Sequence, residues 1–339
     1  MLDLLKTLCP ATGVSGDEAD AAKAAEKLLS PLGRVEHTPL GSVLCYVPPV
    51  KAGLPRVMLV AHLDQVGLMV TRITDKGFLK VAACGGPDRR TLAGARVTVH
   101  TACCKLPGVV VATPPHLSDG KTKTAKPEEL SVDIGLSAEA AREKVALGDR
   151  IVLDGVLEPL FGDRVCSAAL DDRAGCAAVI RAAELLKKTE KAEIIVALVS
   201  QEEVGSSGAA TSAFAVAPDF AFVVDVSMGL TPDEKAEACG EMGKGPMIGV
   251  APILDRRLSL RLTETAKRAN IPWQIEVMAS RTGTDADAIA VSGKGVRAAL
   301  VSIPLRFMHT PGEVVSLSDV ENTARLIAET VGGGLCNSR

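Results

Sequence analysis

Two neighbouring acids, Glu202 and Glu203, are the residues of this chain whose types and spacing point most directly to chemistry. They follow the apolar run 194–199, which predicts a buried strand. Side chains alternate between the two faces of an extended chain, so neighbouring carboxylates at a strand end point in different directions. One of them can then hold a metal ion while the other transfers a proton. An acidic pair alone usually marks a solvated strand end, so this interpretation depends on the rest of the chain.

Other apolar runs of the chain also lead into side chains that bind metals. The runs 57–61, 220–224 and 298–303 are followed by such residues, namely His62 with Asp64, Asp225, and His309. In α/β sheets, ligands gather outside the carboxyl ends of the strands, which is where these residues are expected to lie. Asp171 stands just before a predicted helix, where a carboxylate can cap the helix or bridge two ions.

Each of these residues has an ordinary structural explanation when it is taken alone. A single histidine after a strand is more often a hydrogen-bonded surface residue, Asp225 is typical of a turn, and Asp171 or Asp172 is typical of a helix N-cap. Together, two imidazoles and several carboxylates match the ligands of zinc or cobalt hydrolases. They suit a two-metal site with ions about 3.5–4 Å apart. We therefore expect two divalent metal ions per subunit, with Zn²⁺ favoured and Co²⁺ or Mn²⁺ also compatible.

The elements that must position these residues fall into two regions. Residues 1–64 and 157–339 alternate predicted helices with predicted strands, which indicates an α/β domain with helices flanking a sheet. Residues 65–156 instead contain short β-type runs separated by Gly, Pro and polar turns. The sequence therefore predicts a split catalytic α/β domain that carries an inserted β-rich domain at 65–156.

Local patterns predict where three helices begin. Ser15 with Glu18 forms a capping-box pattern before an Ala-rich run, and Ser318 with Glu321 forms another before the last helix. The loop 282–285 also leads into a helix. Thr284 can cap that helix, or the loop can offer backbone N–H groups to a substrate.

The composition excludes several classes of partner. The chain has one Trp, one Tyr and six Phe, so it lacks the stacking platforms that polysaccharides and single-stranded nucleic acids require. A net charge of -3 gives no basic field for nucleic acid or an anionic membrane. No apolar run is long enough to span a bilayer. The nine cysteines are scattered without a C-x-x-C motif and there is no signal peptide, which favours a cytoplasmic protein with reduced thiols.

Several short motifs occur in a fixed order over nearly the whole chain. They lie at 61–67 (AHLDQVG), 169–173 (ALDDR), 201–205 (QEEVG), 224–226 (VDV), 282–286 (TGTDA) and 306–311 (RFMHTP), with 113–117 and 133–135 inside the insertion. In these motifs the chain resembles the tetrahedral (TET) aminopeptidases, the glutamyl and deblocking aminopeptidase-like exopeptidases with co-catalytic metals. The resemblance implies a zinc-exopeptidase-like mixed sheet with an inserted PDZ-like or barrel-like domain. It also implies that the insertion drives dimerisation and that dimers assemble into a homododecamer.

The resemblance also assigns roles to the candidate residues. It implies one metal ion held by His62, Asp171 and Asp225, and a second held by Asp171, Glu203 and His309. Glu202 is then the general base and acid, and Asp64 hydrogen-bonds His62 and fixes its tautomer. The implied reaction is metal-dependent removal of N-terminal residues from short peptides. Gln65 and Phe307 depart from the family pattern, where Glu and Tyr are usual, but neither departure removes a ligand or the base.

Three alternative functions remain. A glycan-cleaving enzyme would use Glu202 and Glu203 as paired acids, but adjacent residues on an extended backbone face apart and stacking aromatics are scarce. A related metal-dependent amidohydrolase, such as a deacylase or carboxypeptidase, would use the same ligands. A non-catalytic peptide-binding assembly is the third alternative, and it has no need of a base at Glu202.

Overall fold

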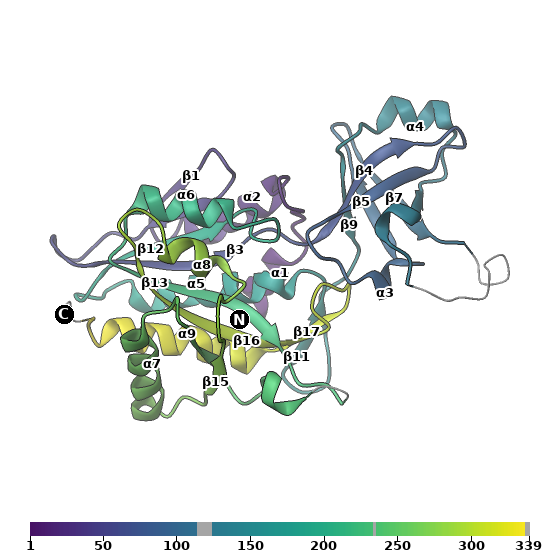
Figure 1. Cartoon of the computed structure of the whole chain (residues 1–339). Coiled ribbons are helices and arrows are strands. Elements are labelled where there is room, and N and C mark those ends of the chain that lie inside the picture. Colours follow the sequence, from purple (N-terminus) through teal and green to yellow (C-terminus); the bar gives the residue numbers. More distant parts are fainter. Residues whose placement is uncertain (114–123, 233–234, 336–339) are drawn as a thin grey trace.

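The computed structural model describes residues 1–113, 124–232 and 235–335, and it divides them into an α/β region and a barrel (Figure 1). Figure 1 shows the barrel as a separate lobe beside the α/β region. The predicted fold, a mixed sheet flanked by helices with an inserted β-rich unit, is confirmed. Residues 114–117 of the motif at 113–117 lie outside the described residues.

Parallel strands form the centre of the large sheet. They are β12 (Glu193–Val199), β3 (Arg56–His62), β13 (Phe220–Met228) and β16 (Arg297–Arg306), adjacent in that order. Because these strands run the same way, their carboxyl ends meet at one edge of the sheet. That edge receives His62, Asp225 and the segment with Glu202 and Glu203.

Shorter strands extend the sheet on both sides of this centre. On the β12 side lie β2 (Val43–Tyr46) and β1 (Arg34–His37). On the β16 side lie β17 (Glu313–Ser316), β11 (Arg164–Ser167) and β10 (Glu158–Pro159), while β14 (Met247–Val250) pairs with β16 and with β15 (Gln274–Val277). β17 pairs antiparallel with β16, so the loop 307–312 between them, which carries His309, lies at the carboxyl edge of β16.

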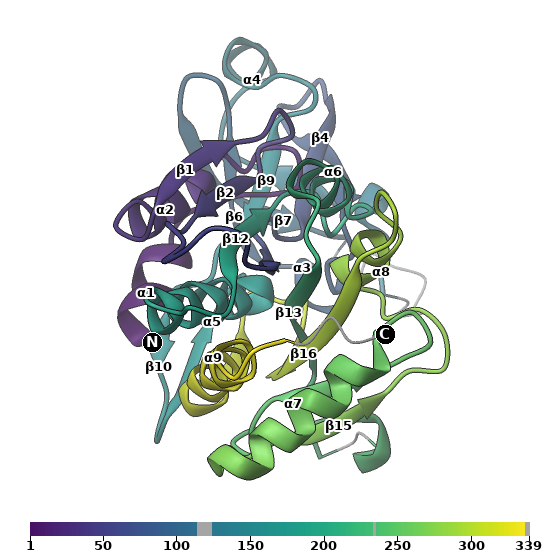
Figure 2. The ribbon, with the colours of Figure 1, turned by 90° about the vertical axis from the view of Figure 1, so that its left-hand side faces the viewer.

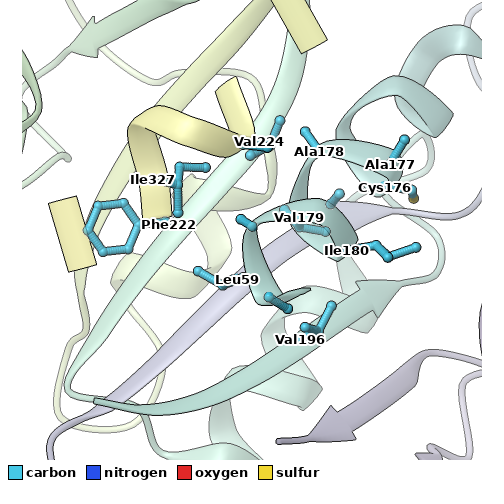
Figure 3. Close-up of a cluster of buried hydrophobic side chains, with 14 of the residues drawn as sticks. Leu59, Cys176, Ala177, Ala178, Val179, Ile180, Val196, Phe222, Val224 and Ile327 are labelled. Atoms are coloured by element: carbon cyan, nitrogen blue, oxygen red, sulfur yellow. The ribbon is translucent and has the colours of Figure 1, made fainter. Parts of the chain in front are cut away.

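Helices cover both faces of the large sheet (Figure 2). One face packs against α1 (Leu2–Leu8), α2 (Ala19–Leu29), α5 (Leu170–Leu186), α7 (Arg256–Ala269) and α9 (Leu317–Gly332). The other face packs against α6 (Ser207–Val216) and α8 (Asp285–Ala290). Figure 3 shows Leu59 and Val196 of the strands near Val179 and Ile180 of α5, and Phe222 beside Ile327 of α9. Alanines on α5 let it approach the sheet closely.

The alternation of side chains along the strands decides which face holds the candidate site. In β3, Val57 and Leu59 face α5, whereas Met58 and Val60 face α6 and α8. Continuing this alternation places His62 on the α6–α8 side. The same counting along β13 and β16 places Asp225 and Ser302 on that side, where they are neighbours in register.

The barrel has its own hydrophobic core. Its strands are, in order, β4 (Gly67–Ile73), β5 (Leu79–Cys84), β8 (Ser131–Asp133), β7 (Lys105–Val111), β6 (Arg96–His100) and β9 (Arg150–Leu153), which pairs back with β4. Short helices accompany it at α3 (Arg89–Leu92), η2 (Pro127–Glu129) and α4 (Ala138–Lys144). Leu68, Val97 and Ile151 are among its fully buried residues.

Among the described residues, no helix is long and apolar enough to cross a membrane.

Both capping-box predictions were wrong. α2 begins at Ala19 without a side-chain cap, because the Ser15 hydroxyl donates to Asp64 Oδ2 instead, at 2.6 Å. α9 is capped by Ser316, whose Oγ accepts from the backbone N–H of Asp319, while the Ser318 hydroxyl donates to an aspartate of the β10–β11 turn. In both cases the serine hydroxyl that the local pattern predicted as a helix cap donates instead to a carboxylate that is distant in the sequence. Thr284 does cap α8, accepting from the N–H of Ala286.

Candidate active site

The structure brings the five predicted metal ligands together at the carboxyl edge of the sheet. His62 Nε2 lies 3.1 Å from Asp171 Oδ1 and 4.0 Å from Asp225 Oδ1. His309 Nε2 lies 3.3 Å from Asp171 Oδ2 and 3.4 Å from Glu203 Oε2. Asp171 therefore stands between the two imidazoles and turns one carboxylate oxygen toward each.

Sharp turns of the backbone aim these residues at one another. Gln201 and His309 adopt left-handed φ values of 61° and 63°, which non-glycine residues rarely do. The first turn directs Glu202 and Glu203 back over the end of β12. The second separates β16 from β17 and directs His309 toward Asp171. Strained conformations of this kind are held by their surroundings and are common at functional sites.

The carboxylate of Asp64 connects three segments of the site. It is fully buried and accepts from the hydroxyl of Ser15 and from the N–H groups of Glu202 and Glu203, at 2.6, 2.9 and 3.2 Å. The predicted contact with His62 is looser, because Nδ1 lies 3.5 Å from the carboxylate and 3.0 Å from the main-chain oxygen of Asp64. Burial opposes ionisation of Asp64, but the contact with His62 outweighs it and lowers the pKa. Asp64 thus orients one imidazole and the turn that bears both glutamates.

The ring of His309 is oriented by the segment that follows β5. Its Nδ1 lies 2.8 Å from the carbonyl oxygen of Gly86, so Nδ1–H donates there and Nε2 is left to face Asp171 and Glu203. A Cβ on Gly86 would stand 3.4 Å from Nδ1 of this ring. A Cβ on Gly85, whose φ is +74°, would stand 3.2 Å from Glu203 Cβ. The barrel region therefore contributes directly to the site.

Sequence reasoning missed Glu313, which holds two of the candidate ligands. Glu313 is 2% exposed, its Oε2 accepts from the N–H of Asp171 at 3.0 Å, and its Oε1 accepts from the N–H of His309 at 2.7 Å. The sequence did contain one signal. Glu313 stands directly before the apolar pair Val314-Val315, which indicates a buried segment, and an acid at the start of a buried segment needs a buried partner.

Asp172 also has a role that the sequence left open. Its Oδ2 accepts from the N–H of His62 at 3.3 Å, and its Oδ1 accepts from the N–H of Gly175 at 2.9 Å. The second bond caps the regular part of α5, as the N-cap explanation predicted. Asp171 and Asp172 themselves have non-helical backbone angles and are joined by a cis peptide bond. Asp172 is thus a cap that also holds the main chain of His62.

The arrangement of donor atoms fits divalent cations. Bonds of about 2.0–2.2 Å in a tetrahedral site place neighbouring ligand atoms about 3.3–3.6 Å apart. The nitrogen–oxygen distances of 3.1, 3.3, 3.4 and 4.0 Å bracket that spacing. Nitrogen and carboxylate oxygen are also the donor types that zinc, cobalt and manganese accept.

The electrostatics of the cluster likewise favour the binding of a cation. Burial raises the pKa of both Glu203 and Asp225, and other nearby carboxylates add to the effect. Burial also disfavours the charged form of His309, but hydrogen bonds to Asp171 and Glu203 outweigh it and raise its pKa to about 11. Acids packed this closely are stabilised by a cation, and bound metal ions supply the largest local charges in such sites.

A cavity of about 290 Å³ opens beside the cluster. Its wall includes the five candidate ligands, Glu202, the loop 282–284 and residues of β13, β15 and β16. The side chain of Glu202 faces this space without belonging to the ligand cluster, and burial raises its pKa to about 8. A carboxyl group of this kind can both accept and release a proton near neutral pH.

This fold and this cavity define a hydrolase of the exopeptidase type. The chain belongs to the M42 glutamyl aminopeptidase family, whose match covers residues 41–326. It is therefore a peptidase, and the resemblance to the TET aminopeptidases is confirmed by solved structures.

Relatives and solved structures align with nearly the whole chain. The chain is 34% identical to the lysyl aminopeptidase of Pyrococcus furiosus over 96% of its own length and 94% of that protein. The TET aminopeptidase of a marine-sediment Thaumarchaeota archaeon superposes with a TM-score of 0.91 at 31% identity, over 98% of this chain and 99% of that chain. The TET1 peptidase of Pyrococcus horikoshii gives a TM-score of 0.82 at 31% identity, over 97% and 98%.

Proposed function

We propose that this chain is a metal-dependent aminopeptidase that removes N-terminal residues from short peptides, with Glu202 as the general base and acid. The observation that carries the proposal is the position of Asp171 between two imidazoles, with Glu202 facing the same cavity. A binding module without catalysis would have no use for a half-buried carboxyl group with a raised pKa beside the candidate ligands.

Two divalent cations fit this site, one at His62, Asp171 and Asp225 and the other at Asp171, Glu203 and His309. When bound, they would polarise the scissile carbonyl and lower the pKa of a water molecule toward about 7. Zn²⁺ is the favoured ion, and Co²⁺ or Mn²⁺ suit the same donors.

The residues of the chain then handle the proton. Glu202 takes a proton from the attacking water and delivers it to the leaving amine. Its main-chain N–H donates to the carboxylate of Asp64, which fixes the backbone from which the side chain reaches the cavity. A cavity of about 290 Å³ is at the small end of ligand pockets, which suits a terminal residue better than a long segment of peptide.

Replacement of Glu202 by glutamine tests the proposal. Glu202→Gln should retain its bound metal by elemental analysis but lose at least about 100-fold in kcat on an aminoacyl anilide, because the amide cannot accept the water proton. Glu264→Gln removes an exposed acid from α7 and is the matched control, for which no change is expected. Near-normal turnover of Glu202→Gln would show that another group is the base. Cleavage of N-acylated substrates in preference to free amines would favour a deacylase instead.

We also propose that residues 65–156 form a dimerisation domain and that the dimers build a homododecamer. The barrel has a separate hydrophobic core, so it can present a surface without rearranging the α/β region, residues 1–64 and 157–339. The TET1 peptidase of P. horikoshii can assemble into a tetrahedron or a large octahedral shell, and that protein matches this one over nearly its full length. Native mass spectrometry should give twelve chains per particle, and a monomer at micromolar concentration would contradict the proposal.

A further inference from the structure

The cavity beside the candidate ligands contains one further acid, Glu276 of β15. Its two oxygens accept from two serine hydroxyls, Oε1 from Ser227 at 2.5 Å and Oε2 from Ser302 at 2.6 Å. Ser302 is the neighbour of Asp225 in register, and Ser227 follows Asp225 by two residues on the same face of β13. The carboxylate of Glu276 is thus held over the same face of the sheet as a candidate metal ligand.

Among the described residues, the carboxylate of Glu276 has no cationic partner. Within the part of the chain that the structure describes, no Lys, Arg or His nitrogen lies within 4.0 Å of it. Each of its oxygens accepts one hydroxyl, whereas a carboxylate can accept about four hydrogen bonds in all. The remaining acceptor capacity faces the cavity that it lines.

The wall of the cavity that holds Glu276 is partly apolar. Leu300 precedes Ser302 by two residues on the same face of β16, and Met278 follows Glu276 by two residues, and both line the cavity. Asp225 and Ser302 are opposite each other on adjacent strands, which lie about 4.8 Å apart, and Glu276 Oε2 lies 2.6 Å beyond the Ser302 hydroxyl. The four-carbon stem of a lysine can cover a separation of this order. An apolar wall that ends in an anion is complementary to an alkyl chain that ends in a cation.

We infer that Glu276 selects peptides whose N-terminal residue has a cationic side chain, lysine or arginine, over those that begin with a neutral or acidic residue. The inference rests on the proposed aminopeptidase function, because it places the substrate's free amino group at the ligand cluster and its first side chain toward Glu276. An acidic first residue would meet Glu276 as a like charge in a partly buried cavity, which disfavours its binding.

A purely structural role for Glu276 predicts a different outcome. The two serine contacts tie β15 to β13 and β16, so loss of the carboxylate could loosen that side of the sheet. Every substrate would then be cleaved more slowly by a similar factor, and the melting temperature would fall. Selection of a cation instead predicts a change confined to basic substrates, and a change of KM more than of kcat.

The experiment compares lysyl, arginyl, leucyl and glutamyl p-nitroanilides with the wild type, Glu276→Gln and the control Glu264→Gln. The wild type and Glu264→Gln should prefer the two basic substrates. Glu276→Gln should lower kcat/KM for these two roughly 10- to 100-fold and leave leucyl hydrolysis within about twofold, since a charge-assisted bond is lost. Glu276→Lys should favour the glutamyl substrate.

Binding without turnover gives a second readout. Lysine and norleucine share an aliphatic stem, but only lysine ends in an ammonium group. Lysine should raise the melting temperature of the wild type more than norleucine does, and Glu276→Gln should abolish this difference. Equal cleavage of all four substrates, or an unchanged lysyl-to-leucyl ratio in Glu276→Gln, would overturn this inference and leave the aminopeptidase proposal intact. Cleavage of none of them by the metal-loaded wild type would overturn both.

Discussion

The two halves of the candidate site are built in different ways. The His62 half, with Asp225, lies on two adjacent strands in the middle of the sheet, His62 as the last residue of β3 and Asp225 within β13, and the His62 side chain is 2% exposed. The His309 half, with Glu203, is formed by two turns, and the His309 side chain is 28% exposed. The ring of His62 is oriented within its own loop, by Asp64, whereas the ring of His309 is oriented by Gly86 of the barrel region.

This difference indicates that the halves have different tolerances to change. A ligand fixed by a core strand moves only if the sheet moves, because protein interiors are closely packed. A ligand whose side chain is oriented by a loop of another region moves whenever the two regions move relative to each other. We therefore expect the His309 half to bind its ion less tightly and to exchange it faster.

The largest expected effect separates the halves by removing each imidazole in turn. His62→Ala leaves the buried carboxylates Asp171 and Asp225 without their neighbour, so it should lower the free energy of unfolding by about 2–4 kcal/mol. His309→Ala should cost less than about 1 kcal/mol, because its side chain is more exposed, and should retain one ion per chain after dialysis. Urea unfolding and elemental analysis measure these outcomes. Equal losses of stability and of metal in the two variants would show that the halves are equivalent.

Glu313 offers a test that affects both halves together. Its carboxylate accepts from the main chains of Asp171 and His309, so Glu313→Ala leaves two N–H groups without their acceptor. Positioning groups of this kind are typically worth about 10- to 100-fold in metal affinity, and we expect both ions to weaken by such factors. Competition with a chelator measures both affinities, with the exposed Glu190→Ala as control. Weakening of one ion only would mean that Glu313 serves a single half.

The sequence predicted where the central strands lie, because apolar periodicity is a local signal. The apolar runs 57–61 and 194–199 lie within β3 and β12, and the candidate ligands that follow the predicted runs do gather at one edge. The runs 220–224 and 298–303 end too early, because β13 and β16 continue to Met228 and Arg306. Strands of four residues without an apolar repeat, such as β1, were missed. β1 forms because it pairs with β2, the next strand along the chain, and its own residue pattern does not indicate this pairing.

The hydrogen bonds around the ligands could not be predicted in this way. The contact of Ser15 with Asp64 spans 49 positions, and that of His309 with Gly86 spans 223. No local pattern reports such pairs, and the local pattern at Ser15 favoured a helix cap instead. Glu313 was missed for the same reason, since its partners Asp171 and His309 are joined to it only by the fold.

Substitution of Gly86 tests the dependence of the His309 half on the barrel region. A methyl group here would stand 3.4 Å from His309 Nδ1, at the near limit of ordinary van der Waals contact with the ring that the carbonyl of Gly86 orients. Gly86→Ala should therefore weaken one of the two ions by a few-fold, up to about 10-fold, and leave the other unchanged. Chelator competition measures both affinities.

Gly332→Ala, at the end of α9, is a control for the added methyl group, because the nearest atom to its Cβ would lie 3.9 Å away. If both ions weakened equally, the two halves would not be separately supported.

The smallest expected effect concerns an ion pair that joins the two regions away from the site. Lys105 of β7 lies 2.8 Å from Asp20 of α2, and this contact lowers the pKa of Asp20. The pair therefore stabilises the fold above the unfolded pKa of the aspartate, about 3.9, and its contribution is lost as pH falls through the lower folded value. Because the side chains are 55% and 43% exposed, Lys105→Met should cost only about 0.2–1 kcal/mol at pH 7. Urea unfolding at pH 7 and pH 3 should show a smaller difference between variant and wild type at the lower pH.

The same variant, Lys105→Met, also tests what positions the two regions. Chelator competition should show unchanged affinity for both ions, because the His309 half depends on Gly86 and not on this ion pair. A weakened affinity for either ion would mean that the regions are positioned by their surface charges.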